Sequence, residues 1–161
     1  MNKTTLLRRT VLAAAVLAAS GLAAAQSVKL TLGHGAAPGN PRHEAAVKMA
    51  EVAKAKSNGR IEIQVAPSAQ LGDDAAMVTA LRTGALDISA NSQGAVANAV
   101  PEYAAFGMPF LFSNLDQVWK MLDGPLGKEL ADKTAEKGMV VLGYWDNGIR
   151  HMSNSKRALS K

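Results

Sequence analysis

Segments with strand-like and helix-like hydrophobic patterns alternate along most of this chain, and this alternation restricts its fold more than any other feature. Val28 to Gly33 is typical of a first strand, and a helical pattern follows it from Pro41 to about Ser57. The other predicted elements, in order, are a strand over 60–66, a helix over 73–82, a strand over 86–90, a polar turn or short helix over 91–99, an irregular buried crossover or edge strand over 106–112, helices over 114–122 and 125–137, and a strand over 139–144. Strands joined through helices predict an α/β fold with a largely parallel sheet and helices on both faces.

Residues with strong positional preferences mark the ends of the predicted helices. Pro41 and Pro125 suit the first turn of a helix, where a backbone N–H has no partner in any case. Asp73 and Asn114 suit the capping position that comes before the first turn. Gly84 can take the left-handed conformation that closes a helix. These signals predict where the helices begin and end.

The first residues have the composition of a secretory signal peptide. Three basic residues and no acidic one come before an apolar stretch over 11–19. This stretch is shorter than the roughly 20 residues that a membrane-spanning helix needs. We therefore expect residues 1–25 to be a signal peptide cleaved after Ala25. The pair Arg8-Arg9 matches a twin-arginine signal only in part, so we expect the general secretion route. The mature chain should reach a periplasm without stable insertion in the membrane.

Charge and composition argue against several classes of protein. Removal of residues 1–25 takes away three of the 18 basic residues and none of the 13 acidic ones, which leaves 15 against 13 and a net charge of +2. Basic residues are scattered and aromatic residues make up only 4%, so we do not expect nucleic-acid binding. The chain has no cysteine, so we expect neither a lipid-anchored lipoprotein nor a disulfide framework.

The sequence lacks the common motifs of nucleotide binding, metal binding and catalysis. The glycine-rich stretch over 33–39 matches neither G-x-G-x-x-G nor the Gly-Lys-Ser/Thr ending of a phosphate-binding loop. The three histidines, His34, His43 and His151, have no spacing of a metal-binding pair on a helix, and no G-x-S-x-G elbow is present. We therefore expect no cofactor, no metal and no enzyme activity, and we expect His43 to be solvated at a helix start.

Polar residues follow several predicted strands, at the edge of the sheet where open parallel sheets bind ligands. These candidates are His34, Gln70 to Asp74, Asn91 to Gln93, and Asn147 to Arg150. Arg150 suits an organic acid best, because a guanidinium offers paired donors that match a carboxylate. Some of the other candidates also have a purely structural interpretation, as a helix cap or as turn formers; they are Asp73, Asn91, Ser92 and Asn147. For each of these four residues taken alone, we favour the structural interpretation.

Several segments of the chain, taken in order, are similar to those of one protein family. They are 32–34, 59–63, 67–73, 84–87, 109–112, 123–130 and 143–150. The sequences Gln-Leu-Gly-Asp, Pro-Phe-Leu-Phe and Asn-Gly-x-Arg within them are quite specific when they occur together. The chain resembles the extracytoplasmic solute-binding proteins of tripartite ATP-independent periplasmic (TRAP) transporters, the DctP-type family, over nearly all of its mature length.

The resemblance implies a two-lobed α/β periplasmic binding protein. Such a protein captures an organic acid, a C4-dicarboxylate or a sugar acid, and delivers it to an ion-coupled TRAP membrane permease. Residues 26–146 would form most of the first lobe and 147–161 the crossover and start of the second, so we expect an N-terminal fragment. Together with the candidates above, the predicted ligand-binding residues are Arg150, Ser92, Asp73, Asp74, His34, Gly35, Asn91 and Asn147. A periplasmic enzyme acting on small organic acids and an orphan sensor-type binding protein are the alternatives.

Overall fold

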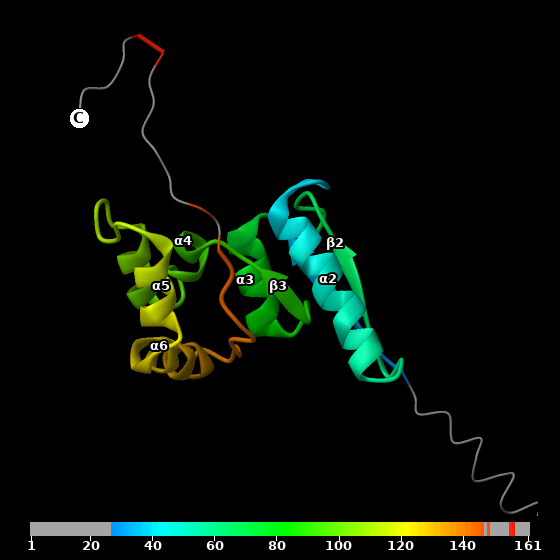
Figure 1. Ribbon diagram of the computed structural model, residues 1–161. Coiled ribbons are helices and arrows are strands. Elements are labelled where there is room, and N and C mark those ends of the chain that lie inside the picture. Colours follow the sequence, from blue (N-terminus) through cyan, green and yellow to red (C-terminus); the bar gives the residue numbers. More distant parts are fainter. Residues whose placement is uncertain (1–26, 147, 149–154, 157–161) are drawn as a thin grey trace, which may run out of the picture.

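The computed structural model describes residues 27–146, 148 and 155–156, and Figure 1 shows how their helices and strands are arranged. The predicted signal peptide over 1–25 and the predicted site residues Asn147 and Arg150 lie outside the described residues. The elements, in chain order, are β1 (Val28–His34), α2 (Pro41–Lys56), β2 (Ile61–Ala66), α3 (Asp74–Thr83), β3 (Ile88–Ala90), α4 (Gln93–Val96), the 3-10 helix η1 (Pro101–Gly107), α5 (Leu115–Leu122) and α6 (Pro125–Ala135). All of the predicted helices and three of the predicted strands are present close to their expected bounds.

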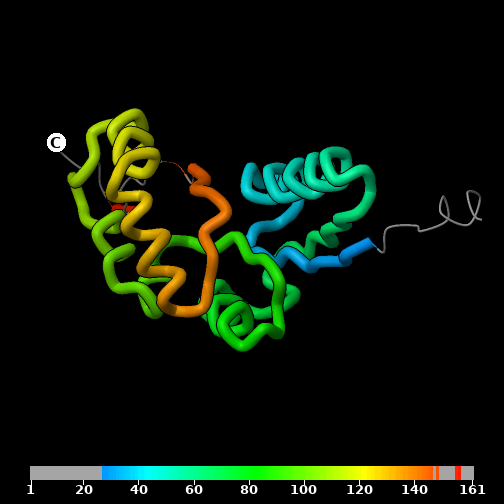
Figure 2. Tube along the Cα trace, turned by 90° about the horizontal axis from the view of Figure 1, so that it is seen from below, coloured from blue at the N-terminus to red at the C-terminus, as the bar shows by residue number. Residues whose placement is uncertain are grey.

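The three strands form one parallel sheet in the order β2-β1-β3. Val28 of β1 pairs with Ile61 of β2, and Leu32 of β1 pairs with Ile88 of β3. Helix α2 packs against β1 and β2, helix α3 packs against β1 and β3, and Figure 2 shows the two helices on opposite sides of the sheet. The predicted α/β fold is therefore confirmed. Its parallel register brings the carboxyl ends of all three strands to one edge.

Side-chain caps fix the starts of the helices at the predicted places. Asp73 Oδ1 accepts a hydrogen bond from the backbone N–H of Ala76 at 2.8 Å, which caps α3. Asn114 Oδ1 accepts from the N–H of Gln117 at 3.1 Å, which caps α5. Gly84 ends α3 in the left-handed conformation, with a φ of 74°. Each such cap contributes on the order of 1 kcal/mol, and all three predictions are confirmed.

A turn after β2 holds the loop that follows β1. Ser68 and Ala69 both have left-handed backbone angles, with φ of 56° and 55°. Their N–H groups donate to the carbonyl oxygens of Ala36 and His34, at 2.9 and 3.1 Å. This conformation costs a non-glycine residue about 1–2 kcal/mol, so the two hydrogen bonds offset local strain. The loops after β1 and β2 are thereby tied together at the carboxyl edge of the sheet.

The helical part of the molecule, from α4 to α6, packs around a hydrophobic cluster. Its buried side chains are Val78, Val100, Tyr103, Leu130 and Met139. Because Val78 belongs to α3, the cluster also joins the helical part to the sheet. Burial of a large apolar side chain stabilises a fold by about 1.5–3 kcal/mol, so this cluster is the main source of stability for α4 to α6.

Helices α5 and α6 meet at a corner that requires glycine. A Cβ atom added to Gly127 would lie 1.7 Å from the carbonyl oxygen of Leu122. This distance is far below any van der Waals contact, and the atom it meets belongs to the backbone. No side chain can therefore occupy position 127 unless the two helices move apart.

The prediction of a strand over 139–144 is wrong. The segment is irregular and forms no ladder with any strand of the described residues. Met139 is buried in the cluster and the Tyr144 hydroxyl donates to the carbonyl oxygen of Gly127 at 3.0 Å, while Val140 and Leu142 are 78% and 67% exposed. Hydrophobic alternation predicts one buried face, but a strand also needs the backbone of a neighbouring strand. Here the segment is held by side chains and by a hydrogen bond from the Met139 N–H to the carbonyl oxygen of Thr134 at 3.3 Å.

The segment over 106–112 begins with the last two residues of η1 and is otherwise irregular, as predicted, but it is not a buried crossover or an edge strand. Phe106 packs against the cluster, whereas Met108, Phe110 and Leu111 are exposed, Phe110 by 97%. Phe110 has a left-handed φ of 63°, which turns the chain outward directly after Pro109. The hydrophobic composition of this segment therefore did not predict its burial.

Candidate functional site

The carboxyl edge of the sheet brings together most of the predicted site residues that the structure describes. His34 is the last residue of β1, and Asp74 is the first residue of α3. Asn91 and Ser92 follow β3 directly. Gly35 lies against Asp74, since a Cβ atom added to Gly35 would be 3.2 Å from Asp74 Oδ1. Residues far apart in the sequence therefore meet where the parallel topology predicts a ligand crevice.

Asp74 connects α3 to the segment after β3. Its Oδ2 accepts hydrogen bonds from both the backbone N–H and the Oγ–H of Ser92, each at 2.9 Å. The carboxylate lies in the first turn of α3, where the helix dipole stabilises a negative charge. With a side chain only 18% exposed, Asp74 is a fixed, mostly buried anion.

Arg42 is a site residue that the sequence did not reveal. Its Nη1 lies 3.5 Å from each carboxylate oxygen of Asp74 and 3.5 Å from the carbonyl oxygen of Ala90. These contacts are at the outer limit of hydrogen-bond length, although the side chain is only 20% exposed. Asn40 caps α2 by accepting from the Arg42 N–H at 2.9 Å. One signal in the sequence could have identified Arg42. It is a basic residue in the first turn of a helix that begins at the carboxyl edge of the sheet.

Two histidines contact each other next to this ion pair. His34 is fully buried, and its Nε2 lies 3.2 Å from Nδ1 of His43, while its Nδ1 accepts from the N–H of Ala36 at 3.1 Å. Burial lowers the pKa of His34, the nearby His43 and Arg42 lower it further, and Asp74 opposes them. His43 lies at a helix start as expected, but it is only partly exposed to solvent, because its ring packs against His34.

Asp73 and Asn91 combine structural roles with positions at the site. Asp73 caps α3 and also lines the depression described next. Asn91 Nδ2 donates to Ser89 Oγ at 2.6 Å, and its Oδ1 is buried without a hydrogen-bond partner among the described residues. A buried acceptor without a partner costs about 1–3 kcal/mol, so a donor that reaches this oxygen would be bound favourably.

An open depression of about 530 Å³ lies over these residues. Its walls come from the loops after β1 and β2 and from the first turns of α2 and α3; the lining residues are Gly35, Ala36, Asn40, Arg42, Ala69, Asp73 and Asp74. The volume is in the range of pockets that bind small molecules. Two helix N-termini with partial positive charges, the Arg42 guanidinium and the carboxylates of Asp73 and Asp74 border the depression, so its walls carry charges of both signs.

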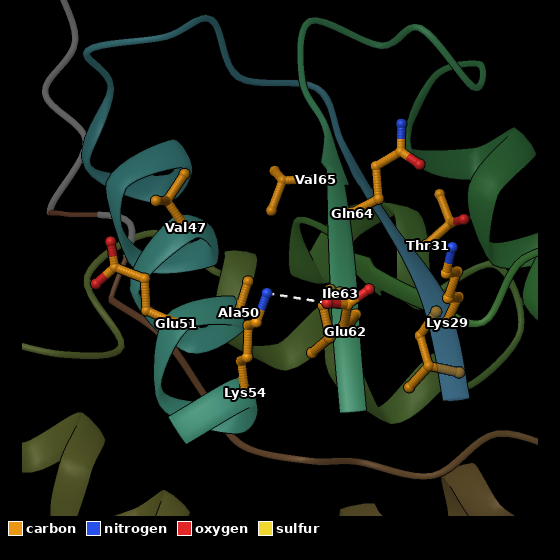
Figure 3. A pocket seen from close by; sticks show the side chains of 11 residues that line it. Lys29, Thr31, Val47, Ala50, Glu51, Lys54, Glu62, Ile63, Gln64 and Val65 are labelled. Atoms are coloured by element: carbon orange, nitrogen blue, oxygen red, sulfur yellow. Dashed lines mark hydrogen bonds and ion pairs between the residues drawn. The ribbon is translucent and has the colours of Figure 1, made fainter. Parts of the chain in front are cut away.

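A second hollow of about 520 Å³ lies between α2 and the strands β1 and β2, away from the carboxyl edge (Figure 3). Apolar side chains such as Val47 and Val65 line it from both sides. At its mouth, Lys54 Nζ and Glu62 Oε1 form an ion pair at 2.9 Å. Because Lys54 pairs with Glu62 and the other two charged residues of the lining, Lys29 and Glu51, also differ in sign, the hollow has no net charge and is a poor receptor for an organic acid. We therefore place the candidate site at the carboxyl edge.

The described residues do not gather the side chains of a metal centre. Within them, no group of three or more His, Cys, Asp or Glu side chains could hold a metal ion. In the same part of the chain, none of the helices combines the length and the apolar character that a membrane crossing requires. Polar and charged groups that suit a small organic ligand are what the carboxyl edge offers.

The family model described as bacterial extracellular solute-binding protein, family 7, named DctP, matches residues 32–161. The chain belongs to this family. The matched range includes all the residues of the depression, from Gly35 to Asp74. The resemblance inferred from the sequence is confirmed, and it places the chain among solute-binding proteins.

Individual relatives are similar to this family-7 chain in sequence, and a solved structure is also similar to it in fold. A protein of Sinorhizobium fredii, y4mM, is 57% identical over 131 residues, which are 81% of this chain and 24% of that protein. The C4-dicarboxylate-binding periplasmic protein DctP of Rhodobacter capsulatus is 32% identical over 81% of this chain and 40% of its own length. The crystal structure of the sugar acid binding protein DctPAm from Advenella mimigardefordensis, in complex with galactonate, matches with a TM-score of 0.78 and 34% identity, over 82% of this chain and 43% of that chain. The chain thus spans less than half of each relative and has the fold of periplasmic solute-binding proteins.

Proposed function

We propose that the protein containing this chain is a periplasmic receptor of a TRAP transporter, which binds a carboxylate-bearing solute and delivers it to an ion-coupled membrane permease. The observation that carries this proposal is the mostly buried Arg42 guanidinium in the wall of the depression. Family membership supports it, and so do relatives described as binding a C4-dicarboxylate or galactonate. Residues 1–25, with the composition of a signal peptide, agree with a periplasmic location.

The geometry of Arg42 suits a carboxylate that comes from solution. Among the described residues, the contacts of its guanidinium are made by Nη1 and are 3.5 Å long, so the guanidinium is held in place without being saturated. Asp74 keeps two shorter hydrogen bonds from Ser92. A ligand carboxylate can therefore form charge-assisted hydrogen bonds with Arg42 without leaving Asp74 unpaired.

Other groups at the edge suit the rest of such a solute. The Oδ1 of Asn91, which has no hydrogen-bond partner among the described residues, is an acceptor for a ligand hydroxyl. Ser92 and Gly35 border the same network. Arg150, predicted to contribute a second guanidinium, stays a prediction because it lies outside the described residues.

Binding calorimetry on the purified full-length protein tests the proposal, with galactonate and succinate as probes. We expect at least one of the two acids to bind, and Arg42→Ala to weaken that binding by about 2–4 kcal/mol, the scale for loss of a desolvated charged partner. Arg82→Ala is the matched control, because Arg82 is an exposed arginine in the last turn of α3. Equal affinity of Arg42→Ala and the parent protein would disprove the role of Arg42, and absence of binding by both acids would count against the receptor function.

A further inference from the structure

The contacts of His34 define which of its ring nitrogens carries a proton. The N–H of Ala36 donates to His34 Nδ1 at 3.1 Å, so Nδ1 has no proton. The neutral ring then carries its proton on Nε2, which donates to Nδ1 of His43 at 3.2 Å. His43 Nδ1 must therefore also be unprotonated. The two rings form a directed chain from the Ala36 N–H to α2, and this chain requires both histidines to be neutral.

A proton on either ring breaks this chain. On His34 it would occupy Nδ1 and face the N–H of Ala36. On His43 it would occupy Nδ1 and face the Nε2–H of His34. The charged groups around His34 are Arg42, next to His43 on α2, and Asp74 on α3. Burial, His43 and Arg42 lower the pKa of His34, in that order of importance, and Asp74 only partly opposes them, so the neutral ring is preferred.

The histidine pair also connects two parts of the depression. Ala36 lines the depression and its loop is tied by the N–H of Ser68, which donates to Ala36 O at 2.9 Å. Arg42 directly precedes His43 in the first turn of α2. The hydrogen bonds of His34 therefore hold the loop after β1 and the start of α2 in a fixed relation, on which the position of the Arg42 guanidinium depends.

We propose that neutral His34 is a positioning residue that holds the loop at Ala36 and the start of α2 around the ligand site, so that acid weakens ligand binding. This inference rests on the proposed receptor function. It assigns His34 a role without direct contact with the solute, because the ring is fully buried and both of its nitrogens have partners in the protein.

The same protonation affects stability in a defined direction. Because folding lowers the pKa of His34 below its ordinary value of 6.5, the unfolded chain binds a proton more readily than the folded chain. The contribution of His34 to stability is therefore fully present above about pH 6.5. It is lost as the pH falls from that value through the lowered pKa of the folded state.

Two measurements on the full-length protein test the proposal. The first is NMR of the imidazole nitrogens near pH 6.5, which needs no ligand and is thus independent of the receptor function. We expect His34 to be neutral with its proton on Nε2. A proton on Nδ1, or a charged ring at this pH, would overturn the proposal.

The second measurement is the affinity for galactonate at about pH 7.5 and about pH 5, where the ligand carboxylate, with a pKa of about 3.5, stays ionised. We expect the affinity of the parent protein to fall about tenfold at the lower pH, which corresponds to losing about one hydrogen bond.

Two variants test whether His34 causes this loss. His34→Asn keeps an acceptor near the position of Nδ1, but the new side chain does not titrate. The affinity of this variant should therefore change less than about threefold between the two pH values. His43→Asn keeps the acceptor for His34 and should retain the acid-dependent loss. A parent affinity that is independent of pH, or an equal loss in His34→Asn, would refute the role of His34.

Discussion

The carboxyl edge of the sheet and the helical cluster both bury polar groups, but they satisfy them differently. In the cluster, the Thr134 hydroxyl donates to the carbonyl oxygen of Leu130 at 2.6 Å, and the Tyr144 hydroxyl donates to that of Gly127 at 3.0 Å. Each hydroxyl has a short bond to a helix carbonyl. At the sheet edge, among the described residues, the Arg42 guanidinium has only contacts of 3.5 Å, and Asn91 Oδ1 has no partner.

Because of this difference, we expect substitutions in the two regions to affect stability and ligand binding differently. Groups that are fully satisfied inside the protein have nothing left to offer a ligand, so changes in the cluster should alter the free energy of unfolding alone. The Arg42 guanidinium, which lines the depression and has long contacts, is available to a solute, so changes there should alter ligand affinity as well. Three substitutions test this separation.

Gly127→Ala should have the largest effect on stability. Its Cβ would meet the carbonyl oxygen of Leu122 at 1.7 Å, so α5 and α6 must move apart, and we expect a loss of about 3 kcal/mol or more. Urea unfolding of the two proteins gives the difference. The matched control is Gly94→Ala in α4, where an added Cβ meets no atom within 4 Å. Equal stability of the two variants would show that the corner is not tightly packed.

Asp74→Ala should affect both stability and binding. It removes the acceptor of two hydrogen bonds from Ser92 and the anionic partner of Arg42, and we expect unfolding to become easier by about 2 kcal/mol. Asp74→Asn keeps an acceptor for Ser92 and removes only the charge, so its free energy of unfolding should fall by about half as much as that of Asp74→Ala. Chemical denaturation together with calorimetric binding of galactonate measures both effects. A variant with reduced stability but unaltered affinity would break the distinction between the two regions.

Tyr103→Phe should have the smallest effect. Because the Thr134 proton is used by Leu130 O, the Tyr103 hydroxyl donates to Thr134 Oγ1 at 3.1 Å, and its removal should cost about 1 kcal/mol. Thermal unfolding of the variant and the parent checks this value. Ligand affinity should stay the same, and a change in affinity would mean that the cluster and the site are coupled.

The sequence predicted the elements well because their limits depend on local chemistry. Asp73, Gly84 and Asn114 act within their own helices, so their roles can be inferred from their neighbours alone. The strand expected over 139–144 failed because its formation depends on a distant backbone, which no local pattern reveals. The exposure of Phe110 likewise depends on how a turn is oriented against the whole molecule.

The candidate site was only partly predictable for the same reason. Parallel topology placed Asp74 and Ser92 near each other, although 18 positions separate them in the sequence. The ion pair of Arg42 with Asp74 spans 32 positions and the pairing of two histidines depends on ring orientation, so neither has a local signature. The prediction for Arg150 stays untested because that residue lies outside the described residues.

The order of the strands also has a consequence for how this part of the chain folds. β1 comes first in the sequence but lies in the middle of the sheet, with β2 on one side and β3 on the other. Neither pairing is local, since Val28 must find Ile61 and Leu32 must find Ile88. Such long-range parallel contacts form slowly. Until Ile88 reaches the sheet, β1 keeps one open edge, which makes this early stage of folding the most vulnerable to pairing with another chain.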